Sequence, residues 1–247
     1  MLPVGICKFC GQKKELINSH ITPKCFYQIK TMGSMSRINP KTQQIDYKNH
    51  KNGLKEPLLC KECDNQLGIL DEYANKVLFY IIPKHEFKVI TESVKEYLLE
   101  VSDFDYDKLR RFFISLVWRT SICKTEPFPL GKYEEIALKI LKNEISDNED
   151  LFLPLIYRKS TNTPVDCITG LFSYKFLGKH ACRFRFPNYE IVVIINTKNS
   201  NDENIMNLLR QMFSRNKIKV IEIMKKTPLD YKLISEMVKI QKTIKHK

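Results

Sequence analysis

Apolar residues recur along the chain at two kinds of spacing, and these spacings predict where helices and strands form. Steps of three and four residues, typical of an amphipathic helix, begin just past Cys63 and recur in residues 104–122 and 133–145. Continuous and alternating apolar runs within residues 165–196 are typical of strands. The elements expected after these are a helix over 203–214, a strand over 218–223 and a basic helix over 229–244. We therefore expect an α+β fold.

The first third of the chain has a different pattern, rich in turn-forming and polar residues. Residues 15–21 predict a strand, and the polar stretch from Gly33 to Gly53 predicts a long loop or an irregular hairpin. A short apolar segment then leads into the first helix, for which Asp64 is well placed as the N-cap. We divide the chain into an N-terminal module, residues 1–90, and a C-terminal domain, residues 91–247, that is helical first and mixed α/β afterwards.

Charge is spread unevenly over the 247 residues, whose net charge is +13. Residues 1–70 hold eleven Lys and Arg against five Asp and Glu, and residues 208–247 hold eleven against three, so the middle is close to neutral. Two basic ends indicate a polyanionic partner such as nucleic acid. No uncharged run approaches the ~20 residues of a membrane helix, and the first residues lack a secretory signal. We expect a cytoplasmic protein that does not enter the membrane.

Two Cys-x-x-Cys pairs, Cys7-Lys8-Phe9-Cys10 and Cys60-Lys61-Glu62-Cys63, are the strongest chemical signal in the sequence. In a reducing compartment such pairs indicate a tetrahedral metal site rather than disulfides, and four thiolates are typical of structural Zn²⁺. The alternative is a coincidence of small buried thiols. Four further cysteines lack this spacing and are expected in the core: Cys25, Cys123, Cys167 and Cys182.

Between the two pairs lies the motif Ser19-His20-Ile21-Thr22-Pro23-Lys24. Together with Cys7-x-x-Cys10 and Leu58-Leu59-Cys60-x-x-Cys63, it resembles the HNH endonucleases, the ββα-metal nucleases also called His-Me finger enzymes. The resemblance covers about the first third of the chain and is greatest for a bacterial, zinc-stapled subset, some of whose members act in anti-phage defence. It implies an N-terminal ββα-metal module, held together by the structural zinc, ahead of the mixed α/β region.

The same resemblance assigns roles to individual residues. His20 would be the general base, because a neutral imidazole can take a proton from water at physiological pH. Asp64, with Asn65 as a further ligand, would hold a catalytic Mg²⁺ or Mn²⁺ through oxygen atoms. Asp71 and Glu72 are second-choice ligands. The central Asn of the family falls at Lys55, whose ammonium group would instead contact the scissile phosphate.

Each of these residues also has a simpler interpretation. His20 would otherwise be a structural histidine, and Asp64 only a helix cap. Ser19 stands where the family has a metal-binding residue. Arg110, Arg111 and Arg119 are expected on a solvated helix rim rather than in a phosphate clamp.

We therefore predict a metal-dependent HNH endonuclease that hydrolyses phosphodiester bonds, with double-stranded DNA as substrate. The alternative is a zinc-stabilised nucleic-acid-binding module that has lost its nuclease activity. A further alternative is an adaptor to a partner ATPase or another defence-system protein, for which residues 104–247 would form the interface.

Overall fold

The fold is known from a computed structural model. It describes most of the chain, and all structural statements below refer to these residues: 2–27, 36–38, 45–46, 53–85, 88–89, 97–125, 128–146, 151–159, 167–169, 172–176, 179–186, 188–197, 203–215 and 217–223.

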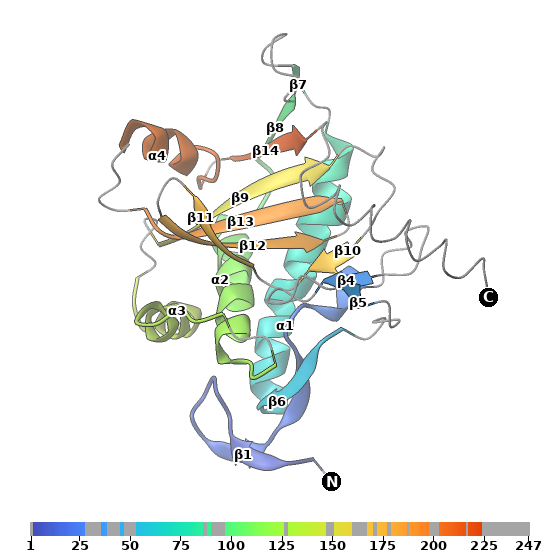
Figure 1. Ribbon diagram of the computed structural model, residues 1–247, viewed down its shortest axis with the longest axis vertical. Coiled ribbons are helices and arrows are strands. Elements are labelled where there is room, and N and C mark those ends of the chain that lie inside the picture. The colour runs from blue at the N-terminus through green and yellow to red at the C-terminus, as the bar shows by residue number, and fades with distance from the viewer. Residues whose placement is uncertain are drawn as a thin grey trace, which may run out of the picture.

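A seven-stranded sheet forms the body of the molecule (Figure 1), in the order β11-β12-β13-β9-β14-β8-β7. Its strands are β7 (Lys88–Val89), β8 (Tyr97–Val101), β9 (Leu151–Lys159), β11 (Phe172–Phe176), β12 (Lys179–Phe186), β13 (Tyr189–Asn196) and β14 (Ile218–Ile223). Neighbouring strands are antiparallel except for β9 and β14. Seven of the eight residues of β13 are buried, which is the pattern of a strand covered on both faces.

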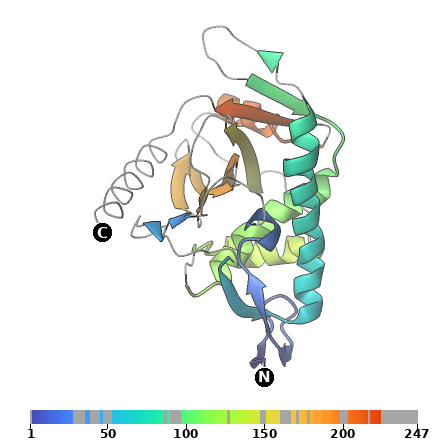
Figure 2. The same cartoon turned by 90° about the vertical axis from the view of Figure 1, so that its right-hand side faces the viewer.

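Two long helices, α1 (Lys61–Lys76) and α2 (Tyr106–Ile122), pack together on one face of this sheet. Figure 2 shows α1 running along one side of the molecule. Aromatic contacts join helix α2 to the sheet through Phe26, which lies in neither. The ring of Phe26 stacks on Phe186 of β12 with centroids 4.3 Å apart and also meets Phe112 of α2. The hydroxyl of Tyr189 donates to the carbonyl of Leu78. The buried hydrophobic cluster extends from the first residues of the chain to the sheet.

Helix α1 begins four residues earlier than the sequence predicts. Cys60 is its N-cap residue, so the expectation that Asp64 caps the helix was wrong. After Lys76 the helix continues through a π-helical turn, Val77–Ile81, and a 3₁₀ turn, Ile82–Lys84.

Helix α2 follows its prediction closely but is buried almost all round. Asp105 caps it by accepting a hydrogen bond from the amide of Lys108 at 3.0 Å. Arg110 and Arg119 are 0% and 3% exposed, so the expectation that they lie on a solvated rim was wrong. Each guanidinium instead bonds groups on neighbouring elements. Arg111 is half-buried and donates to the carbonyl of Leu141.

Smaller sheets make up the N-terminal part. They are β1 (Val4–Ile6) with β2 (Lys13–Glu15), β3 (Ile17–His20) with β6 (Lys55–Leu59), and β4 (Ser36–Ile38) with β5 (Ile45–Asp46) and β10 (Cys167–Thr169). A 3₁₀ turn, η1 (Lys24–Tyr27), follows β3. The antiparallel pairing of β4 with β5 agrees with an irregular hairpin in the polar stretch.

The mixed α/β class predicted from the sequence is confirmed. Helices α3 (Tyr133–Leu141) and α4 (Glu203–Arg210) are shorter than expected, and α3 ends beside Asn143, whose φ is +60°. Strand β9 was not predicted at all. The proposed boundary between residues 90 and 91 and the basic helix over 229–244 lie outside the described residues. Among the described helices, none combines the length and the hydropathy needed to cross a bilayer.

Candidate metal centre and the histidine site

The four paired cysteines meet in one cluster, formed by Cys7, Cys10, Cys60 and Cys63. Their sulfur atoms all lie within 4.8 Å of one another, although the two pairs are about fifty residues apart in sequence. Zn–S bonds of about 2.3 Å in a tetrahedron place sulfur atoms about 3.8 Å apart, so the cluster fits one ion with little adjustment. Among the described residues, the cluster is the one place where three or more Cys, His, Asp or Glu side chains come close enough to share a metal ion.

Backbone hydrogen bonds shape the first turn of the cluster. The amide of Gly11 donates to the carbonyl of Cys7 at 2.9 Å, and the amide of Cys7 donates to Gln12 at 2.9 Å. Gly11 closes this turn at φ +76°, a conformation that a residue without Cβ adopts at little cost. The amide of Lys8 donates to the carbonyl of Leu58 at 3.0 Å, which joins this turn to β6 and hence to the second pair.

Thiolates in this cluster need a positive counter-charge, because three of the four cysteines are buried. The amide of Cys60 donates to the sulfur of Cys7 at 3.3 Å. Burial raises the pKa of Cys7, but hydrogen bonds from the amides of Cys10, Cys60 and Phe9 outweigh it and bring the pKa to about 7. Burial raises the pKa of Cys60, and burial together with the neighbouring sulfur atoms raises the pKa of Cys63, so a bound cation would have to stabilise these two thiolates.

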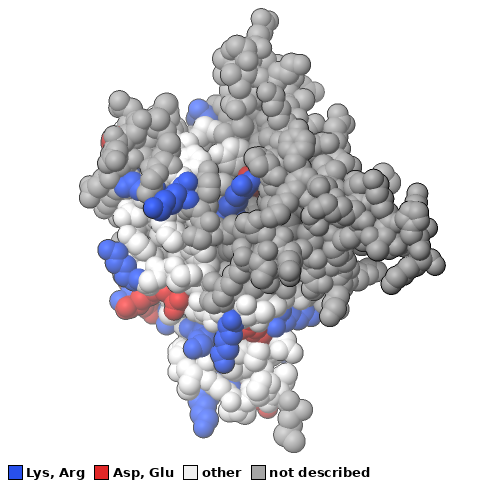
Figure 3. Space-filling view, viewed as in Figure 1, with Lys and Arg blue, Asp and Glu red and all other residues white. Residues whose placement is uncertain are grey.

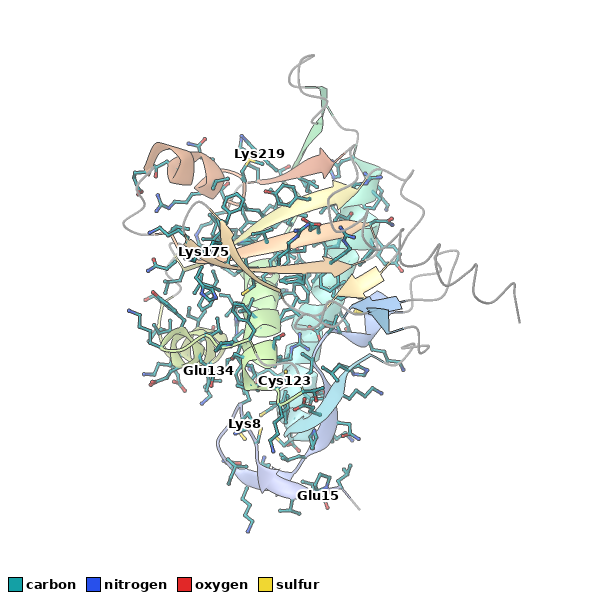
Figure 4. All side chains as sticks on the ribbon, in the orientation of Figure 1. Lys8, Glu15, Cys123, Glu134, Lys175 and Lys219 are labelled. Atoms are coloured by element: carbon teal, nitrogen blue, oxygen red, sulfur yellow. The ribbon has the colours of Figure 1, made fainter. Side chains whose placement is uncertain are left out.

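The remaining cysteines are not part of this cluster. Cys123, labelled in Figure 4 near the end of α2, and Cys182 are buried free thiols, as expected for core residues. Cys25 is half-buried, and its thiol donates to the carbonyl of Asp71 at 3.9 Å. Burial, with the nearby charge of Asp71, raises its pKa to about 12. The side chain of Cys167 lies outside the described residues.

His20 is the last residue of β3 and pairs across the sheet with Lys55 of β6. Residues directly opposite in an antiparallel pair have Cβ atoms about 5 Å apart, so the exposed Lys55 side chain starts next to His20. His20 is half-buried, and its Nε2 atom is shielded from solvent. The predicted strand around the histidine and its pairing with the segment before the second Cys pair are thus present.

Arg119 of α2 connects His20 to α1. Its Nη1 donates to the carbonyl of His20 at 3.2 Å and to Asp71 Oδ2 at 2.9 Å. Its Nη2 donates to Asp71 Oδ1 at 2.6 Å and to Ser115 Oγ at 3.1 Å, while Nε donates to the carbonyl of Ser115 at 3.4 Å. Burial raises the pKa of Asp71, and the charge and hydrogen bonds of Arg119 oppose that rise.

The other predicted ligands lie on α1. Asp64 is half-buried in the first turn, and Asn65 and Glu72 are exposed. Asp64 and Asp71 are two turns apart on one face of the helix, about 10 Å along its axis. Between them lies Gly68, where an added Cβ would meet nothing within 4 Å. Through Arg119, the structure links Asp71 to the main chain of His20.

Two residues next to His20 in the paired strands β3 and β6 are structural. Ser19 is fully buried, with its hydroxyl 3.5 Å from the carbonyl of Ile17. Glu56, opposite Ser19, is 7% exposed and accepts hydrogen bonds of 2.8 Å from the amides of Lys124 and Thr125 just after α2. Burial raises the pKa of Glu56, but the amide of Lys124, the side chain and amide of Thr125 and the charge of Lys124 together outweigh it and hold the pKa below its ordinary value.

A cavity of about 450 Å³ lies on another side of the cysteine cluster, between its first turn and helices α2 and α3. Figure 4 shows Lys8 below the helix that carries Glu134, and both line this cavity. Its other lining residues are Trp118, Ile122, Glu135 and Leu138. Neither His20 nor Asp64 is among them, so this cavity is separate from the histidine site.

No family model matches the chain, and no curated protein or solved structure does either. The function must therefore be argued from the geometry of the site itself.

Sequence reasoning missed two residues of the site, Arg119 and Glu56. A signal for Arg119 exists, because positions 112, 116 and 119 fall on one stripe of α2 and the first two are apolar. An arginine on an apolar stripe indicates a buried partner. Glu56 has no comparable local signal, because its partners are backbone amides nearly seventy residues away.

Proposed function

We propose that this protein is a metal-dependent endonuclease of the HNH type that hydrolyses phosphodiester bonds in DNA. The observation that carries the proposal is the succession β3–β6–α1, an antiparallel pair of strands followed at once by a helix. His20 lies at the end of the first strand and is connected to Asp71 of that helix through Arg119. This is the order of elements in the ββα-metal nucleases that the sequence motif resembles.

The four-cysteine cluster supports the proposal as a scaffold. Four thiolates complete the coordination of Zn²⁺ and leave no position for a reactive water, which is typical of structural sites. The cluster joins the turn before β2 to the first turn of α1. The proposed zinc would thereby fix the helix relative to the strand that carries His20.

In the proposed mechanism His20 takes a proton from the attacking water. Asp64 and Asn65 would hold a Mg²⁺ or Mn²⁺ ion, since both offer oxygen ligands, whereas the carboxylate of Asp71 is already paired with Arg119. When bound, that ion offsets the negative charge that develops on the phosphate. Lys55, exposed and opposite His20, would bind a phosphate oxygen of the DNA backbone.

The surface charge of the module supports a nucleic-acid substrate. Among the described residues of the module, seven lysines are exposed: Lys8, Lys13, Lys24, Lys55, Lys61, Lys76 and Lys84. Figure 3 shows Lys and Arg side chains over the described surface of the lower, N-terminal part of the molecule, with fewer acidic ones. A polyanion is attracted to such a surface, and the attraction weakens with added salt.

A second candidate function is binding of nucleic acid without cleavage. It is favoured by the burial of Ser19, by the commitment of Asp71 to Arg119, and by the shielded Nε2 of His20. Together these features leave few ligands for a catalytic ion around the histidine.

A plasmid assay separates the two functions. Zinc-replete protein is incubated with supercoiled plasmid and Mg²⁺ or Mn²⁺, with and without a chelator of the divalent ion. We expect nicking by the wild type and none by His20→Ala, with zinc content and melting temperature unchanged. His85→Ala is the matched control, because His85 follows the 3₁₀ turn Ile82–Lys84, nine residues after the end of α1, and is not part of β3 or β6. Retarded but intact plasmid favours the binding module, and nicking by His20→Ala at the wild-type rate contradicts the nuclease.

A further inference from the structure

We infer that Arg119 is a positioning residue for His20, holding the main chain at the end of β3 against α1. The inference rests on the proposed function, in which His20 is the general base. Arg119 comes from α2, ninety-nine positions away from His20, and lies outside the resemblance that suggested the nuclease.

The contacts of Arg119 exclude a direct role with substrate. A guanidinium has five N–H groups. Nε–H donates to the carbonyl of Ser115. The two hydrogens of Nη1 are donated to the His20 carbonyl and to Asp71 Oδ2. The two hydrogens of Nη2 are donated to Asp71 Oδ1 and to Ser115 Oγ. No N–H group remains for a phosphate oxygen. The side chain is also 3% exposed, so DNA cannot reach it.

The bonds instead join three elements at one point. The carbonyl of His20 belongs to β3, Asp71 belongs to α1, and Ser115 belongs to α2. The carboxylate of Asp71 accepts two hydrogen bonds from the planar guanidinium of Arg119, which orients that group and compensates its charge. The remaining Nη1 hydrogen then points at the His20 carbonyl. A lysine in the same place would carry the charge but has no fixed fork, so it could not hold these acceptors in one geometry.

Placement of the general base decides how fast a proton is transferred, because catalysis requires the reacting groups to lie within about 3 Å in the right orientation. The chain turns immediately after His20, where the strand ends. An anchor on the His20 carbonyl therefore limits the rotation of the residue that carries the imidazole.

The test compares Arg119→Lys with Arg110→Lys in the full-length, zinc-loaded protein. Arg110 is a matched control, since it lies on the same helix, is 0% exposed, and donates to the carbonyls of Leu151 and Phe152 in β9. We expect both variants to melt at lower temperature. Below their melting temperatures, we expect kcat for cleavage of a labelled duplex to fall at least tenfold only in Arg119→Lys, with KM within twofold of the wild type.

A second measurement does not depend on cleavage. In ¹⁵N-labelled protein, the ring signals of His20, assigned by their loss in His20→Ala, should shift in Arg119→Lys and stay in place in Arg110→Lys. If the wild type cuts no DNA, the proposed function fails, while this measurement still tests the positioning role. If Arg119→Lys does not fold, Asp71→Asn takes its place, and we expect the same shift and the same loss of kcat.

Three results would overturn the inference. The first is a folded Arg119→Lys with His20 signals or kcat of the wild type. The second is an equal effect of Arg110→Lys, because the loss would then reflect a general loosening of α2. The third is a rise in KM alone, which would mean that Arg119 contacts DNA.

Discussion

The carboxylate of Glu56 gives the sharpest prediction about stability. It is buried between β6 and the end of α2 and accepts two amide hydrogen bonds of 2.8 Å. In Glu56→Gln the amide oxygen can accept one of these bonds, but the NH₂ group faces the other backbone N–H. A hydrogen bond to a charged group contributes about 1.5–3 kcal/mol, and a buried donor left unsatisfied costs about 1–3 kcal/mol. We expect the free energy of unfolding to fall by about 3 kcal/mol at pH 7.

The pH dependence of this difference follows from the direction of the pKa shift. The pKa of Glu56 is lowered in the folded protein, whereas in the unfolded chain it is about 4.3. The contribution of the ionised Glu56 carboxylate to the free energy of unfolding is therefore fully present above about pH 5 and is lost as the pH falls through the folded-state pKa. Between the two pKa values the stability difference between wild type and variant should shrink, by at most about 1.4 kcal/mol per pH unit.

Urea unfolding of zinc-loaded wild type and Glu56→Gln between pH 7 and pH 3.5 measures the stability difference at pH 7 and its change with pH. Titration of the cysteine cluster affects the two proteins alike, so it cancels in their difference. Glu15→Gln is the control, because Glu15 is exposed and its replacement should leave the curve unchanged. A Glu56→Gln protein as stable as the wild type at pH 7, or a difference that does not change with pH, would refute the reasoning.

Three further predictions concern other parts of the fold. Gly68→Ala should raise the free energy of unfolding by about 1 kcal/mol, because the added methyl meets open space and alanine is the better helix former; a lower urea midpoint would contradict this. Cys60→Ser should lower the zinc content measured by atomic emission, whereas the control Cys182→Ser should keep the zinc. Both Cys60→Ser and removal of zinc from the wild type by a chelator should speed amide hydrogen exchange at the start of α1. Phe26→Ala should cost about 3–5 kcal/mol in urea unfolding, because the ring is fully buried against aromatic rings of α2 and the sheet; a cost below 1 kcal/mol would show that these contacts are wrong.

Features set by short sequence separations could be predicted. The Cys-x-x-Cys spacing predicted the cluster, and the three- and four-residue spacing of apolar residues predicted α2 almost to the residue. A strand over residues 15–21 and the apolar segment leading into Cys60 were also predicted; the structure has β2 end at Glu15 and β3 run from Ile17 to His20, and it pairs β3 with β6.

Features that depend on distant partners could not be predicted. Strand β9 lies between β13 and β14 although it contains Pro154, and an internal proline normally argues against a central strand. The burial of Arg119 depends on Asp71, forty-eight residues earlier, and periodicity within one helix does not reveal such a pair. The start of α1 was misjudged because Cys60, a poor side-chain cap, occupies the N-cap position.

The saturated guanidinium of Arg119 also restricts how this protein can change during evolution. Loss of Asp71 would leave a buried cation without its counter-charge, and loss of Arg119 would leave a buried carboxylate without a donor. Either single change is more damaging than both together, since two apolar residues of similar volume can fill the space. In sequences that descend from the same ancestor, positions 71 and 119 should therefore vary as a pair, and a chain that has replaced both should no longer constrain His20 through α2.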